Sequence, residues 1–202
     1  METHSHSHSQ QKEQEEYFDI LDEKGRSLGY KKLRAHVHRE GDWHRVVHVW
    51  IRNSKNELLL QKRSDEKLSY PGLYDISAAG HIGAGESSLD TAMRELEEEL
   101  GVKGLPASAF KFLFTAKGSK ILNEGTFVDN ELQDVYLLEI DVPLESLVLQ
   151  ESEVSGAKYM SVKEYKEHLQ KGDPSLVPAD LGEYGRFFEY LDTHMPVATP
   201  YG

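Results

Sequence analysis

The chain has 202 residues and no cysteine, so it is long enough for one domain with its own core, and disulfides, thiolate nucleophiles and cysteine-ligated zinc are excluded. Its formal net charge of -12 makes nucleic acid and anionic membranes unsuitable partners. An anionic substrate is compatible with this charge only if a metal or a local basic patch offsets the field. No stretch reads as an apolar membrane span or a signal peptide, so we expect a cytoplasmic protein.

The first 16 residues differ in composition from the rest. Residues 1–16 are polar and of low complexity, and His4, His6 and His8 alternate with serine. Such a composition is more typical of a disordered tail than of a metal site. We therefore expect a tail at 1–16 and one folded domain at 17–202.

Short β-rich runs alternate with turn residues along the chain. Turn residues at 53–56 join two of these runs into a hairpin, and Pro71-Gly72 predicts a loop over 67–73. The predicted strands are 17–21, 46–51, 57–61, 75–79, 110–116, 127–140 and 157–161.

Three segments have the pattern of helices. The first begins near Ser88 or Leu89 and ends at Gly101, and the second covers 163–170. The third, 184–194, places apolar side chains on one face. Strands, a central helix, more strands and terminal helices predict an α/β fold in which a mixed sheet has helices on both sides.

A glycine-rich loop runs into an acidic helix between Gly80 and Val102. Glu95, Glu98 and Glu99 are spaced i, i+3 and i+4, so their carboxylates share one helix face within about 6 Å. Arg94 is the only cation inside this helix. Because like charges repel, such a face indicates a site for a divalent cation.

Residues 80–102 read G-x5-E-x7-R-E-U-x-E-E-x-G-U, where U is aliphatic, and every specified position matches. This stretch resembles the Nudix box, and the resemblance extends over most of residues 17–195. It implies an α/β/α sandwich with a mixed central sheet. It also implies dependence on Mg²⁺ or Mn²⁺ and hydrolysis of a diphosphate linked to another moiety, in a small-molecule substrate.

The same resemblance implies roles for the acidic residues. Glu95, Glu98 and Glu99 would be metal ligands, and one of them, or a loop carboxylate, would be the general base. Arg94 would orient the catalytic glutamate through an ion pair. Glu86 would assist metal binding or hold the loop. The catalytic candidates are Glu98, Glu95 and Arg94.

A second set of residues is similar in order to type 1 isopentenyl-diphosphate isomerase, a Nudix relative. The residues that carry this resemblance are Lys32, His36 or His38, His44, Arg63, Lys67, the run Tyr70–Tyr74, Ala79-Gly80-His81, Asp129 and Glu131. It implies that the substrate is bound by Lys32, Arg63, Lys67, Gly80 and His81. It also implies a possible second metal site made of His44, His81, Asp129 and Glu131, with either His36 or His38 beside them.

Two departures from the isomerase favour a hydrolase. The isomerase has a proton-transferring cysteine where this chain has Ala79, and a methyl group cannot move a proton. The isomerase has also lost most of the acids of the box, whereas this chain keeps them all. The chain is similar, too, to the Nudix domain that plants fuse to a dipeptidyl-peptidase-III-like domain.

The expected activity is therefore Mg²⁺-dependent cleavage of a nucleoside diphosphate derivative or an isoprenoid diphosphate. Two alternatives stay open: a prenyl diphosphate isomerase that uses another acid in place of cysteine, and a non-catalytic Nudix-like binding module. A monomer and a homodimer are both compatible with the sequence.

Overall fold

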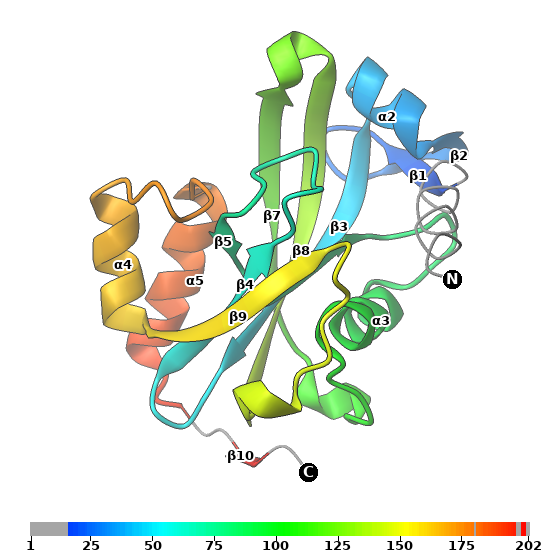
Figure 1. Cartoon of the computed structure of the whole chain (residues 1–202). Coiled ribbons are helices and arrows are strands. Elements are labelled where there is room, and N and C mark those ends of the chain that lie inside the picture. Colours follow the sequence, from blue (N-terminus) through cyan, green and yellow to red (C-terminus); the bar gives the residue numbers. More distant parts are fainter. Residues whose placement is uncertain (1–15, 180, 197–198, 201–202) are drawn as a thin grey trace, which may run out of the picture.

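The computed structural model describes residues 16–179, 181–196 and 199–200 (Figure 1). The predicted tail lies outside these residues, apart from Glu16, which forms an ion pair with Arg34. Within the described ranges, no helix has both the length and the apolar character needed to cross a membrane.

A mixed β-sheet forms the centre of the molecule. Its strands are β1 (Tyr17–Leu21), β2 (Ser27–Leu33), β3 (Trp43–Arg52), β4 (Glu57–Arg63), β5 (Tyr74–Asp75), β6 (Ala78–His81), β7 (Lys111–Leu122), β8 (Phe127–Asp141), β9 (Val154–Ser161) and β10 (Thr199–Pro200). The helices are α2 (Arg34–Glu40), α3 (Ser88–Leu100), α4 (Val162–Gln170) and α5 (Leu181–Thr193). Short 3-10 turns lie at Ala107–Ala109, Asn123–Gly125 and Leu144–Ser146.

Strands β3 and β8 run parallel to each other at the middle of this sheet, paired from Trp43↔Asn130 to Arg52↔Glu139. Strand β7 pairs antiparallel with β8, and β6 pairs antiparallel with β3. Strand β4 continues the sheet through β5 and β9. Both parallel and antiparallel pairs therefore occur, as the sequence predicts.

Helices cover the two faces of the sheet (Figure 1). On one face, α3 buries Ala92, Leu96 and Leu100, spaced one turn apart, against Val47 and Val49 of β3. On the other face, the side chains of α4 and α5 pack against the same strand; they are Val162, Tyr165, Tyr184, Phe187 and Leu191 around Trp50. The predicted α/β sandwich is confirmed.

The structure differs from the predicted elements in several places. The predicted strand 75–79 is two strands, because the Ser77 hydroxyl donates to the Leu59 carbonyl at 2.6 Å and accepts from the Ile51 amide at 2.8 Å. Strand β7 continues to Leu122, beyond the predicted end at residue 116. Strands β2 and β10 and helix α2 were not predicted. Helix α2 is short and has no side-chain N-cap, so its sequence carries no start signal.

Candidate active site

The glycine loop is fastened to the start of α3 by one carboxylate. Ser87 caps the helix, and its hydroxyl accepts from the Asp90 amide at 3.1 Å. The Glu86 carboxylate accepts from the Gly83 amide at 3.2 Å and from the Thr91 hydroxyl at 3.1 Å. Of the two roles expected for Glu86, these contacts match the holding of the loop.

Glu95 lies directly against the backbone of β6. A Cβ atom added to Gly80 would come within 2.1 Å of the Glu95 carboxyl carbon, so only glycine leaves room for this side chain. Burial raises the pKa of Glu95 to about 7, although the neighbouring Arg94 acts in the opposite direction. A divalent cation beside this carboxylate would reverse the shift, since it favours the charged form.

Glu99, one turn further along α3, is buried and held by neutral donors. Its Oε2 accepts from the Gln61 amide at 3.1 Å and from the Ala79 backbone amide at 3.2 Å. Burial, followed by the nearby charge of Glu95, raises the pKa of Glu99 well above its usual range. Successive residues of β6 therefore position two of the acids of the box.

Arg94 forms ion pairs with three acids of the box. Its guanidinium lies 2.8 Å from Glu95, 3.1 Å from Glu98 and 3.4 Å from Glu86. The expected ion pair between Arg94 and a candidate catalytic glutamate is present. Glu98 differs from its neighbours in exposure: 51% of its side chain is accessible, against 14% for Glu95. The helix therefore presents one open carboxylate beside two buried ones.

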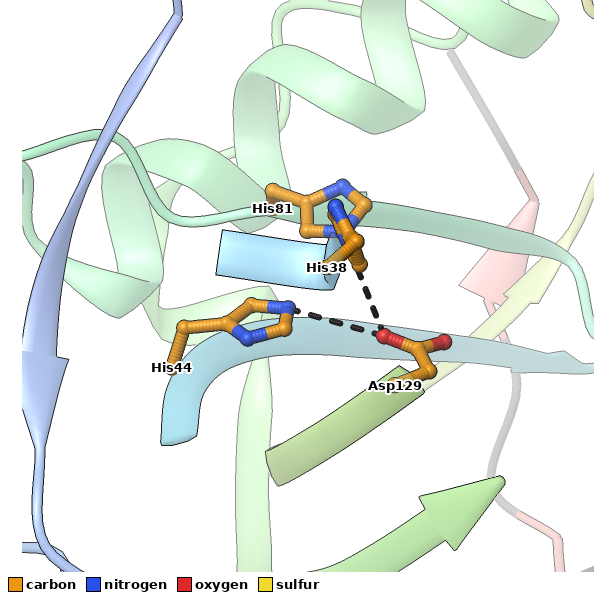
Figure 2. A group of neighbouring side chains, drawn as sticks. All are labelled: His38, His44, His81 and Asp129. Atoms are coloured by element: carbon orange, nitrogen blue, oxygen red, sulfur yellow. Dashed lines mark ion pairs between the residues drawn. The ribbon is translucent and has the colours of Figure 1, made fainter. Parts of the chain in front are cut away.

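Three histidines and one aspartate converge on one point at the end of β6 (Figure 2). They are His38 of α2, His44 of β3, His81 of β6 and Asp129 of β8, and one donor atom from each lies within 4.8 Å of the others. Asp129 Oδ1 is 3.4 Å from His38 Nε2 and 3.7 Å from His44 Nε2. The consecutive elements α2 and β3 thus meet β6 and β8 at one point.

The hydrogen bonds of this cluster fit a metal ion. His38 Nδ1 lies 2.9 Å from the Arg34 carbonyl and His44 Nδ1 lies 3.1 Å from the Asp42 carbonyl, so each Nδ1 carries the proton. Each Nε2 then presents a lone pair. These Nε2 atoms, His81 Nε2 and Asp129 Oδ1 are buried and have no hydrogen-bond partner among the described residues. Buried polar atoms normally find partners, so convergent lone pairs indicate a cation site.

Burial also keeps the imidazoles of His44 and His81 neutral. Burial lowers the pKa of His44 to about 4 and holds the pKa of His81 well below its usual range. The ring of Phe18 stacks on both, with centroids 5.2 Å from His44 and 4.7 Å from His81. Neutral imidazoles in an apolar, aromatic enclosure suit a transition-metal ion better than Mg²⁺.

Two details of this second site differ from the simplest expectation. Of the two histidines left open by the sequence, His38 faces the cluster, whereas His36 is exposed on the same helix. Glu131 lies outside the group of atoms within 4.8 Å, and its carboxylate accepts from the Gln133 amide at 3.0 Å. Burial and the charge of Asp129 raise the pKa of Glu131 to about 7.

Each of the expected basic residues pairs with a carboxylate in the structure. Lys32, on β2, pairs with Glu40 at 2.9 Å and Asp42 at 2.6 Å. Arg63 lies 3.2 Å from Asp75, and Lys67 pairs with Glu153. Among the three, Lys67 is near both halves of the site, since its charge acts on His81 and on Glu99.

Sequence reasoning missed three polar residues near the site. Gln61 donates to Glu99 and follows three leucines in β4. A polar residue directly after such an apolar run is the signal by which it could have been found. Lys120 of β7 lies beyond the predicted end of its strand. The His48 side chain lies 2.6 Å from Glu183 of α5, a contact that no local pattern shows.

Comparison with known proteins shows the family of the chain. The chain matches the NUDIX domain family over residues 42–179. It is 50% identical over 189 residues to Nudix hydrolase 3 of Arabidopsis thaliana, a match that covers 92% of this chain and 24% of that protein, so the chain spans about a quarter of that relative. It is 34% identical to the isopentenyl-diphosphate Delta-isomerase of Pectobacterium atrosepticum, over 74% of this chain and 79% of that one.

A solved structure supports the fold alone. A protein from Deinococcus radiodurans superposes with a TM-score of 0.63 at 24% identity, covering 85% of this chain and 98% of the other. The family match covers most of the chain and includes the glycine loop, helix α3 and the residues that fasten them. The chain therefore belongs to the Nudix hydrolase family, in the group that includes isopentenyl-diphosphate isomerase-like members.

Proposed function

We propose that the protein is a Mg²⁺-dependent hydrolase that cleaves the diphosphate linkage of a nucleoside diphosphate derivative or an isoprenoid diphosphate. The observation that carries this proposal is the contact of Glu95, on helix α3, with Gly80 of β6. Arg94 of the same helix forms ion pairs with Glu95, with Glu98 and with Glu86 of the preceding loop. A complete set of acids, held in place by loop and strand, is what a hydrolytic metal site requires.

Each residue of α3 has a distinct role in this proposal. Glu95, Glu98 and Glu99 would hold the cation, which would neutralise the diphosphate and lower the pKa of an attacking water. Arg94 orients Glu95 and Glu98 relative to each other. Glu98, the exposed carboxylate, pairs with Arg94 through Oε2 and would take the proton of the water through Oε1 as general base.

The cluster of His38, His44, His81 and Asp129 would form a second metal site. Its three imidazoles favour Mn²⁺ or another transition-metal ion over Mg²⁺. It lies one residue along β6 from Gly80, which touches Glu95. A diphosphate placed over the end of β6 would therefore reach both sites.

Isomerisation of a prenyl diphosphate is the second candidate, and the Pectobacterium relative motivates it. Ala79 makes this reaction less favourable, because its methyl group cannot transfer the proton that isomerisation requires. Incubation with isopentenyl diphosphate in D₂O, followed by mass spectrometry, separates the two reactions. Deuterium in the recovered prenyl diphosphate would establish the isomerase, whereas phosphate release without deuterium supports the hydrolase.

The direct test is a panel of diphosphate compounds that includes nucleoside diphosphate sugars, dinucleotides and prenyl diphosphates. We expect Mg²⁺-dependent release of a phosphorylated product from one class and none in the presence of EDTA. Binding of several compounds without turnover of any would support a non-catalytic binding module instead.

A further inference from the structure

Lys120 stands on the same face of the sheet as the histidine cluster. Its Cα is the cross-strand partner of Asp129, one of the four residues of that cluster. Cross-strand partners in an antiparallel pair project their side chains to the same face. The Lys120 side chain is partly buried, and its Nζ lies 5.9 Å from the centre of the Tyr70 ring.

The surroundings of Lys120 are anionic. Glu131, Asp75, Tyr70 and Asp129 all act to raise its pKa, against the opposing effect of burial. Within the described ranges the ammonium makes no ion pair and no hydrogen bond, and the Tyr70 ring lies beside it at 5.9 Å.

The three basic residues expected to bind the substrate differ from Lys120 in this respect. Each already has an acidic partner: Asp42 for Lys32, Asp75 for Arg63 and Glu153 for Lys67. An ammonium with unused donors gains more from a phosphate oxygen than a lysine that must first leave a carboxylate.

We propose that Lys120 is a substrate-binding residue whose ammonium donates to a phosphate oxygen of the diphosphate, on the face that carries the histidine cluster. This inference rests on the proposed function, since it names a further contact for the same substrate. The tip of the β7–β8 hairpin and the loop that carries Tyr70 would then enclose the diphosphate from two sides.

The competing interpretation is structural: Lys120 serves only to hold Tyr70, whose φ of 51° is unusual for a tyrosine. The two interpretations predict different measurements. A structural lysine affects thermal stability and leaves anion affinity unchanged. A binding lysine affects anion affinity at constant stability.

Calorimetric titration with inorganic pyrophosphate in Mg²⁺ decides between them. We expect Lys120→Met to weaken pyrophosphate binding about 10-fold to 100-fold, the usual effect of losing one charged hydrogen bond. The KM of the best substrate should rise in parallel, with kcat changed by less than about threefold. Lys120→Arg keeps the charge and should stay within about threefold of the parent protein.

Lys117→Met is the matched control. Lys117 is on the same strand but on the opposite face, where its Nζ lies 4.4 Å from the Trp43 ring centre and 3.4 Å from Glu23. It should bind pyrophosphate like the parent protein. If Lys120→Met does not fold, Lys120→Gln is measured in its place.

Unchanged pyrophosphate affinity in the Lys120 variant, or no binding by the parent protein, overturns the inference. If a panel compound is hydrolysed but the Lys120 variant binds pyrophosphate with unchanged affinity, the binding role of Lys120 is refuted and the proposed function stands. Binding of pyrophosphate that depends on Lys120, without hydrolysis of any panel compound, would support the role of Lys120 and refute the proposed function.

Discussion

At the scale of single residues, the position of Glu95 depends on the absence of a side chain at Gly80. Gly80 has no Cβ, and Glu95 occupies the space that a Cβ would need. The sequence predicted the acids, because their spacing defines one helix face. It did not predict which of them would be buried, because burial depends on β6, an element placed by pairing with β3.

Gly80→Ala is predicted to reduce turnover about 100-fold, since displacement of a catalytic group by about 1 Å has effects of that order. The measurement is kcat in saturating Mg²⁺, with circular dichroism to confirm the fold. Gly156→Ala is the control, because its added Cβ would lie 3.8 Å from Lys62, at ordinary contact distance. Equal activity of the two variants would refute the role of the Glu95–Gly80 contact.

At the scale of elements, helix α5 is anchored to β3 through a buried charged pair. The His48 side chain lies 2.6 Å from Glu183 Oε2, and the Trp50 indole donates to Glu183 Oε1 at 3.2 Å. The sequence predicted this helix from its apolar face. It did not predict the anchor, because Glu183 and His48 are far apart in the chain. Helix α3 was predicted well, since Ser87 and Gly101 supply local caps.

This pair should make stability depend on pH. Burial opposes protonation of His48, but the charge and hydrogen bond of Glu183 raise its pKa from 6.5 to about 9. A raised pKa stabilises the folded state below about pH 6.5, and that stabilisation is lost as the pH rises through 9. We expect the free energy of unfolding to fall by about 3 kcal/mol between pH 6.5 and pH 9.5.

The check is urea denaturation at several pH values in EDTA. The double variant His48→Gln, Glu183→Gln removes both charges and keeps polar groups at both positions. Its unfolding free energy should be nearly flat over the same pH range. A slope equal to that of the parent protein would assign the effect to other groups.

At the scale of the whole molecule, strand β6 links the two candidate metal sites. Glu95 lies against Gly80, and the next residue, His81, belongs to the histidine cluster, so the two sites lie on opposite faces of the strand. The histidine cluster brings α2, β3, β6 and β8 together at one point. The sequence predicted the fold class, because it follows from the order of strands and helices. The choice of His38 over His36 required the structure, since both occur on α2.

Mn²⁺ is therefore predicted to raise the melting temperature through this cluster. At an ion concentration about 100 times Kd, mass action gives about 2.7 kcal/mol, or about 5–10 °C for a chain of this size. His44→Ala should lose most of this shift relative to its own value in EDTA. His36→Ala, an exposed position of α2, should keep it. Equal shifts in both variants would show that Mn²⁺ binds elsewhere.

The most direct test of the central claim, that helix α3 carries a hydrolytic metal site, compares Glu98→Gln with Glu97→Gln. Glu98 pairs with Arg94 at 3.1 Å, whereas Glu97 is exposed at the position that the box does not specify. With the best compound of the panel in Mg²⁺, Glu98→Gln should lower kcat about 1,000-fold or more, while Glu97→Gln stays within about threefold. Retained activity in Glu98→Gln, with the fold intact, would contradict the assignment.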